Sequence, residues 1–153
     1  EDLQDYYHSG VRLSAGSKEL LGFVQRARSG VEMAWTRIGR SLMEAELSTH
    51  IYFGGYEWLS FKLPGGSYTP DWLYACDPGG LVFVEVKGST RQANYRDARS
   101  KLRAAASLNP WWIFYEARPL KGGRWDLERI SPDENMIYAI LDKFVEVKNG
   151  QGK

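Results

Sequence analysis

Two turn-forming tetrapeptides, Pro64-Gly65-Gly66-Ser67 and Asp77-Pro78-Gly79-Gly80, most constrain how this chain can fold. Clusters of proline, glycine, serine and aspartate mark chain reversals. The two turns separate three stretches of strand character, at residues 56–63, 68–76 and 81–87. Strands joined by such short turns pair antiparallel, so the centre of the chain is predicted to be a three-stranded meander.

Helical patterns flank this meander. Apolar residues at helical spacing predict helices over 17–28 and 31–52, the second interrupted near Gly39 and ended by Gly54-Gly55. After the meander, the pattern predicts a helix over 92–107, a buried strand over 111–115 reached by a crossover, an edge strand over 125–130, and a final helix starting at Ser131. The expected fold class is therefore α/β, a mixed sheet flanked by helices with a helix at the C-terminus.

Composition limits the classes of protein to which the chain can belong. With 153 residues, 43% of them hydrophobic, it is expected to form one folded domain. We divide it into an N-terminal helical extension (1–40), a core (41–117), and an edge strand with a C-terminal helix (118–148). No apolar run reaches the roughly 20 residues that span a bilayer, so no membrane partner is expected. A single cysteine, Cys76, favours a reducing compartment such as the cytoplasm.

Three ionisable residues lie on the last two strands of the meander. Glu85 and Lys87 are two positions apart, so their side chains share one face of a strand, and antiparallel pairing can bring Asp71 beside them. Burying such charges is unfavourable unless they are paired or bind a metal. Two carboxylates and the backbone carbonyl of Val86 are hard oxygen ligands, which suit Mg²⁺ or Mn²⁺. Lys87 is then placed to orient or deprotonate a water, and a lowered pKa would suit it as a base.

The segment that follows is basic, although the net charge of the whole chain is only +1. Its position beside the acids makes it a candidate DNA-binding patch, while a solvated helix face is the ordinary reading of such a run. The candidate DNA-binding residues are Arg91, Arg96, Arg99, Lys101 and Arg103.

At Pro70-Asp71 and Glu85-Val86-Lys87 the chain resembles the PD-(D/E)xK nuclease superfamily. Over residues 41–117 it looks like the small phage-encoded nucleases related to Holliday-junction resolvases. The resemblance implies a restriction-endonuclease-like ααβββαβ core and a Mg²⁺-dependent DNA endonuclease acting in the cytoplasm of a bacterium or a phage-infected host. It also implies that Asp71 and Glu85 are metal ligands, that Lys87 is the catalytic lysine, and that branched or structured DNA is a candidate substrate. A homodimer is the expected partner state, since a resolvase needs two sites to cut two strands.

The superfamily usually adds a glutamate from the helix before the first strand, where this chain offers Glu32, Glu44 and Glu46. With Asp71 level with Ser60 and the chain turning at Gly54-Gly55, the matching helix position lies some eight to ten residues before that turn. This geometry favours Glu44 as the fourth catalytic residue, with Glu46 as the alternative helix acid.

Two other functions fit the same residues. The chain could be a non-catalytic module that binds nucleic acid through residues 91–103. It could also be a nuclease subunit that cuts only inside a larger phage, transposition or packaging assembly, with residues 1–40 and 120–153 as docking surfaces.

Overall fold

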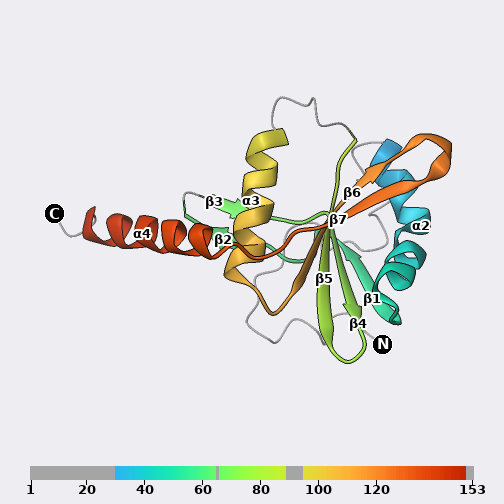
Figure 1. Ribbon diagram of the computed structural model, residues 1–153, viewed down its shortest axis with the longest axis horizontal. Coiled ribbons are helices and arrows are strands. Elements are labelled where there is room, and N and C mark those ends of the chain that lie inside the picture. Colours follow the sequence, from blue (N-terminus) through green and yellow to red (C-terminus); the bar gives the residue numbers. More distant parts are fainter. Residues whose placement is uncertain (1–29, 65, 89–94, 151–153) are drawn as a thin grey trace.

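A mixed five-stranded sheet between helices forms the body of the molecule in the computed structural model (Figure 1). The structure describes residues 30–64, 66–88 and 95–150. The expected helix over 17–28 and most of the N-terminal extension lie outside the described residues. The helices are α2 (Gly30–Leu47), α3 (Tyr95–Leu108) and α4 (Glu134–Gly150), with a short 3-10 turn, η3 (Lys121–Gly123), between the last two strands. The predicted mixed α/β class with a C-terminal helix is confirmed.

The sheet has the strand order β1-β4-β5-β6-β7. Its strands are β1 (Ile51–Tyr56), β4 (Trp72–Cys76), β5 (Gly80–Val86), β6 (Ile113–Pro119) and β7 (Trp125–Arg129). β6 runs parallel to β5, as expected for a crossover through α3, and all other neighbours are antiparallel. A separate two-stranded sheet, β2 (Phe61–Leu63) with β3 (Gly66–Tyr68), forms a hairpin between β1 and β4.

The first strand of the meander was predicted at the wrong place. Residues 56–63 do not form one strand, because β1 ends at Tyr56 and the next segment belongs to the separate hairpin. Ile51 and Tyr52, predicted as helical, begin β1, and the Gly54-Gly55 pair is inside it rather than in a turn. A Cβ on Gly55 would lie 2.2 Å from the Trp58 ring, and one on Gly54 would lie 3.1 Å from the Tyr74 ring. These glycines make room for aromatic rings.

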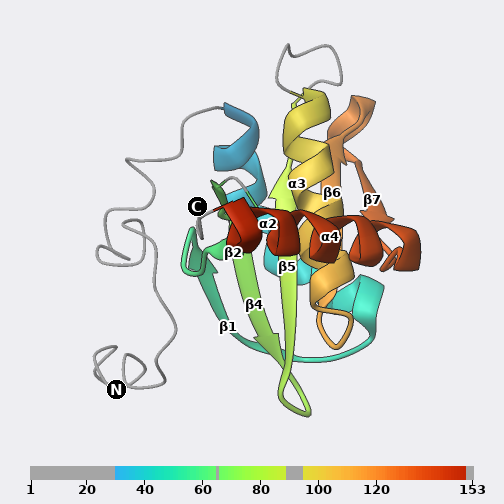
Figure 2. The ribbon, with the colours of Figure 1, turned by 90° about the vertical axis from the view of Figure 1, so that its left-hand side faces the viewer.

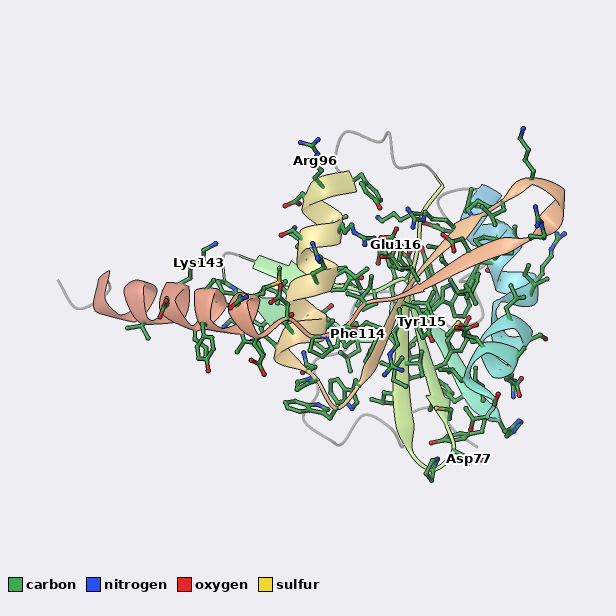
Figure 3. The ribbon with its side chains drawn as sticks, viewed as in Figure 1. Asp77, Arg96, Phe114, Tyr115, Glu116 and Lys143 are labelled. Carbon is green, nitrogen blue, oxygen red and sulfur yellow. The ribbon has the colours of Figure 1, made fainter. Side chains whose placement is uncertain are left out.

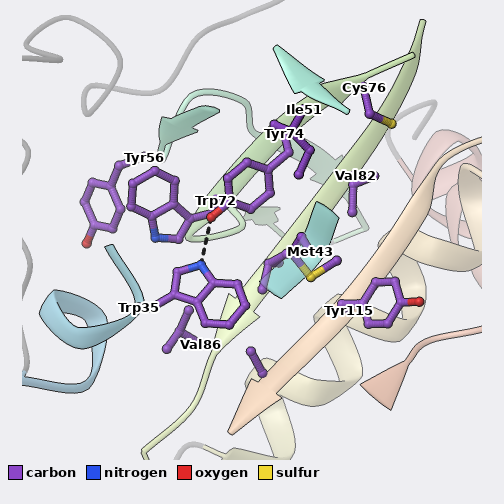
Figure 4. Packing of buried hydrophobic residues seen from close by; sticks show 12 residues of the cluster. Trp35, Met43, Ile51, Tyr56, Trp72, Tyr74, Cys76, Val82, Val86 and Tyr115 are labelled. Carbon is purple, nitrogen blue, oxygen red and sulfur yellow. Dashed lines mark hydrogen bonds between the residues drawn. The ribbon is translucent and has the colours of Figure 1, made fainter. Parts of the chain in front are cut away.

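The face of the sheet under α2 is covered by one hydrophobic cluster, shown in Figure 4. Trp35, Gly39 and Met43 recur every fourth residue and form the buried stripe of α2. The predicted interruption at Gly39 is absent, since α2 runs unbroken through it. Glycine is needed here for packing, because a Cβ would come within 2.3 Å of the Trp35 indole. Trp35 Nε1 donates a hydrogen bond of 2.9 Å to the Tyr74 hydroxyl, which joins helix and sheet.

The opposite face packs against α3 and the β2–β3 hairpin. Leu73, Phe83 and Phe114 of the sheet meet Leu102 and Ala105 of α3 there. The even-numbered residues of β4 and β5 therefore point toward α2, and the odd-numbered residues point toward α3.

The C-terminal helix α4 extends away from the sheet in Figure 1 and crosses in front of it in Figure 2, where that side faces the viewer. Asp133 is its cap, since Asp133 Oδ1 accepts hydrogen bonds from the backbone N–H groups of Asn135 and Met136. The cap therefore lies two residues after the predicted serine cap, Ser131, and the helix begins at Glu134. Among the described helices, none is long and apolar enough to cross a membrane.

Candidate active site

Asp71 and Glu85 meet at one end of the sheet. Trp72 pairs with Val84, so the same register continued by one residue sets Asp71 opposite Glu85. Glu85 follows Phe83 by two positions and therefore lies on the α3 face. Asp71 lies at a bend just before β4, where its Oδ2 accepts the backbone N–H of Val86 at 2.7 Å. The carboxylate of Asp71 thus takes the place of a backbone acceptor at the end of the β4–β5 ladder.

Both carboxylate oxygens of Glu85 have partners. The Tyr68 hydroxyl donates to Oε2 at 2.7 Å, and Lys87 Nζ lies 2.9 Å from Oε1. The glutamate is only 6% exposed, and Tyr68 is buried as well. Charge-assisted hydrogen bonds of this length fix the orientation of a carboxylate. The three residues come from β3, β5 and the segment just after β5, so the site joins the hairpin to the main sheet.

The electrostatics of this cluster favour a bound cation. Burial, followed by the negative charge of Glu85, raises the pKa of Asp71 well above its usual value, against the opposing effect of the Val86 N–H. Burial and the same glutamate raise the pKa of Tyr68, which keeps its hydroxyl a donor. A nearby positive charge would stabilise the ionised form of Asp71, which burial and the neighbouring acid disfavour.

Lys87 differs from the sequence expectation. Burial acts to lower its pKa, but the adjacent Glu85 carboxylate and the charge of Asp71 outweigh it, and the net effect is a raised pKa. In the metal-free site the expected lowering is not found, because the acids that flank the ammonium stabilise its charged form more than burial disfavours it. Without a bound metal ion, Lys87 therefore keeps its positive charge beside the two acids.

The donor set fits a hard divalent cation in part. Within the described residues, no group of three or more histidine, cysteine, aspartate or glutamate side chains could hold a metal ion. The oxygens at the site are those of Asp71 and Glu85, with the Val86 carbonyl as a third donor. Continued from the Trp72–Val84 pair, the register sets Pro70 opposite Val86. Proline has no N–H, so it cannot bond this carbonyl as an ordinary strand residue would.

The structure brings Glu32, and neither Glu44 nor Glu46, toward Asp71. The negative charge of Glu32 contributes to raising the pKa of Asp71, and Glu32 Oε2 accepts a 3.3 Å hydrogen bond from Tyr56, the β1 partner of Trp72. Glu44 lies at the other end of α2, where it contacts His50, the Ile51 N–H and Arg40. Glu46 accepts a 3.4 Å hydrogen bond from Tyr115.

The geometric argument for Glu44 does not hold, because it placed the first strand too late in the chain. Asp71 is level with Glu57, whose N–H donates to the Asp71 carbonyl, and not with Ser60. β1 begins at Ile51, so some six strand residues, about 20 Å, separate its start from this level. At 1.5 Å per residue that distance is about 13 helical residues, which counts back from Leu47 to the first turns of α2. Glu32 lies there.

The predicted DNA-binding residues that the structure describes fall into two groups: some form ion pairs within the protein, and others are exposed to solvent. Arg99 is engaged within the protein: it contacts Glu116 Oε2 at 3.1 Å and Glu128 Oε1 at 2.6 Å. Lys101 pairs with Asp97 at 3.4 Å on the helix surface. Arg96 and Arg103 are exposed on α3, and Arg91 lies outside the described residues. Arg99 is thus a structural contact between α3, β6 and β7, while Arg96 and Arg103 keep their side chains in solvent.

Glu116 is the residue that sequence reasoning missed. It is fully buried and pairs in register with Glu85 on the neighbouring parallel strand. Arg99, Arg118 and the Tyr95 hydroxyl surround its carboxylate, which satisfies the buried charge. The predicted strand stopped at Tyr115, one residue too early. An acid directly after an apolar run, as at Glu85, is the signal that could have revealed it.

Comparison with known proteins does not assign this chain to a family. No family model matches the chain, and no curated protein matches it. A similar solved structure is entitled "Crystal structure of SSO0001", at 16% identity over 85% of this chain and 66% of that chain, with a TM-score of 0.36. The chain therefore spans slightly less than two thirds of that protein's length, and a likeness this weak carries no argument about function.

Proposed function

We propose that this protein is a metal-dependent DNA endonuclease with a restriction-endonuclease-like core. The observation that carries the proposal is the convergence of Asp71, Glu85 and Lys87 at one end of the sheet, with Lys87 2.9 Å from Glu85. The order α2, β1, β4, β5, α3, β6 supports it, since it gives the αβββαβ part of the expected core.

Each residue has a role in this proposal. Asp71, Glu85 and the Val86 carbonyl would hold Mg²⁺ or Mn²⁺, and Glu32 would replace Glu44 as the helix acid. When bound, the ion would polarise a phosphoryl oxygen and lower the pKa of a water molecule. Lys87 holds its charge beside Glu85, where it orients the attacking water and balances charge on the phosphate. Tyr68 keeps the carboxylate of Glu85 in position through its hydrogen bond.

The direct test is cleavage of supercoiled plasmid and of a synthetic four-way junction, with MgCl₂, with MnCl₂ and with EDTA. We expect cleavage that needs the metal and is lost in Lys87→Gln and Asp71→Asn. A matched control is Asp77→Asn, which changes an exposed acid just past the far end of β4 (Figure 3). Cleavage in EDTA, or full activity of Lys87→Gln, would contradict the proposal.

Binding, partner-addition and mass measurements beside the cleavage test separate the alternatives. Salt-sensitive DNA binding without cleavage would favour a non-catalytic module. Cleavage that appears only when a partner protein is added would favour a subunit of a larger assembly. Preference for the junction over the plasmid would support a branched substrate, and a solution mass twice that of the chain would support a homodimer acting on two strands.

A further inference from the structure

The connection between β6 and β7 is a compact basic loop, Leu120–Arg124. Gly122 and Gly123 adopt positive φ angles of 77° and 72°, a conformation that glycine adopts without strain. The Leu120 N–H donates to the Arg124 carbonyl at 2.8 Å, and Arg124 Nε donates to the Lys121 carbonyl at 3.4 Å. These contacts close the loop and leave the charged ends of Lys121 and Arg124 exposed.

The loop lies at the same end of the sheet as the candidate active site. β5 and β6 are parallel, Val86 pairs with Ala117, and the Lys87 N–H donates to the Ala117 carbonyl at 2.9 Å. Lys121 is four residues beyond Ala117, so it lies at most about 13 Å past this level at 3.3 Å per residue. Figures 1 and 2 both show the turn of the hairpin and the end of β5 at the same end of the molecule.

Charged side chains on the hairpin strands form ion pairs, and within the described residues those on its turn do not. Arg118, one residue before the end of β6, pairs with Glu116, Asp126 and Glu128. Across the described part of the chain, Lys121 and Arg124 have no carboxylate partner. Exposed Arg96, at the start of α3, lies on the other side of the end of β5 (Figure 3). Positive side chains thus stand on two sides of an acidic centre.

We propose that the β6–β7 turn is a second phosphate-binding arm, in which Lys121 and Arg124 contact the DNA backbone beside the phosphate held at the Asp71–Glu85 site. This inference rests on the proposed function and names a surface outside residues 91–103. Its reach of at most about 13 Å past the level of Val86, along the strand direction, corresponds to about four steps of 3.4 Å along one strand of duplex DNA. The arm contacts backbone only, so it contributes to affinity without preference for base sequence.

The test is binding of a fluorescent 30-base-pair duplex by anisotropy, in EDTA, at several salt concentrations. Each phosphate contact contributes about 0.9 to the slope of log K against log salt. We expect Lys121→Ala/Arg124→Ala to reduce that slope by up to about 1.8, equivalent to as much as about 60-fold weaker binding at 0.1 M salt. Lys121→Ala alone should lose about 8-fold.

Lys143→Ala is the matched control, because it removes one exposed lysine from α4, away from the site (Figure 3). It should leave affinity and slope unchanged, and unfolding midpoints should confirm that every variant folds. If wild type binds and the double variant binds with the same affinity and slope, the arm is refuted while metal-dependent cleavage still decides the nuclease. If wild type neither binds nor cuts DNA, both proposals fall. A duplex with scrambled sequence should give the same losses; a sequence-dependent loss would overturn the backbone role.

Discussion

The surroundings of Asp71 disfavour its ionised form. Burial and the charges of Glu85 and Glu32 raise its pKa more strongly than the Val86 N–H and the charge of Lys87 lower it. A residue kept in such surroundings is typical of a functional site, where stability is given up for reactivity.

Asp71→Asn should therefore stabilise the metal-free protein. The amide oxygen can still accept the Val86 N–H, and the repulsion from Glu85 disappears. We expect a gain of about 1 kcal/mol in the free energy of unfolding, or about 2–4 °C in Tm, at neutral pH in EDTA. Because the folded pKa lies above the unfolded one, the gain should be present above the folded pKa and shrink as pH falls through it toward 3.8. A Tm lower than that of Asp77→Asn would contradict this.

Tyr68 offers a single-atom test of how Glu85 is positioned. Tyr68→Phe removes only the hydroxyl that donates to Glu85 Oε2. A partner that orients a metal ligand typically contributes about 10–100-fold to metal affinity, so Mn²⁺ binding measured by calorimetry should weaken by that factor. Tyr115→Phe is the control, since it also removes a hydroxyl from a buried tyrosine that donates to a glutamate, here Glu46. Equal Mn²⁺ affinity in the two variants would show that Tyr68 only packs.

At the scale of elements, α2 is where the sequence and the structure differ most. Its apolar spacing continues through Leu47 and Ile51, so a helix to residue 52 was a reasonable expectation. Ile51 instead begins a strand, because it pairs with Cys76 and lies buried under α2. Only tertiary contacts, such as the Trp58 ring against Gly55, distinguish this glycine pair from a turn. Because the strand begins earlier than predicted, Asp71 lies opposite Glu57 and not Ser60. The helix acid nearest to it therefore changes from Glu44 to Glu32.

Other elements were predictable because their signals are local. The turn at residues 77–80, the strand ending in Glu85 and the crossover to a parallel strand all follow from turn chemistry and apolar runs. The convergence of Asp71, Glu85 and Lys87 follows from strand alternation. The pairing of Arg99 with Glu116 and Glu128 did not, since it joins residues 17 and 29 positions apart through the packing of α3 on the sheet.

The placement of α2 predicts that an acid at its start, Glu32, matters for cleavage and that an acid near its end, Glu44, does not. Glu32→Gln should lower cleavage or metal affinity, because its charge acts on Asp71. Loss of one carboxylate near a metal is expected to reduce activity by at least about 10-fold. Glu44→Gln, on the same helix but beside His50 and Ile51, should retain wild-type activity. Plasmid cleavage by the two variants at equal protein concentration measures this, and the reverse order of activities would restore the original choice of Glu44.

For the molecule as a whole, a cation that binds the folded state alone must raise its stability. Stabilisation follows RT ln(1 + [L]/Kd), about 2.7 kcal/mol at 100 times Kd. For a chain of this size we expect a Tm increase of about 5–10 °C in saturating MgCl₂ or MnCl₂. Asp71→Asn should lose most of this increase. An equal increase in wild type and Asp71→Asn would indicate general salt effects and not a site.

The hydrogen bond from the Val86 amide to Asp71 also provides a spectroscopic reporter. A single ¹⁵N–¹H resonance belongs to an amide whose acceptor is the candidate ligand itself. Its chemical shift will follow any event that changes the charge or orientation of that carboxylate, from ion loading to docking of a substrate. In ¹⁵N-enriched protein, this backbone amide thereby reports on the candidate site without an attached probe and without turnover.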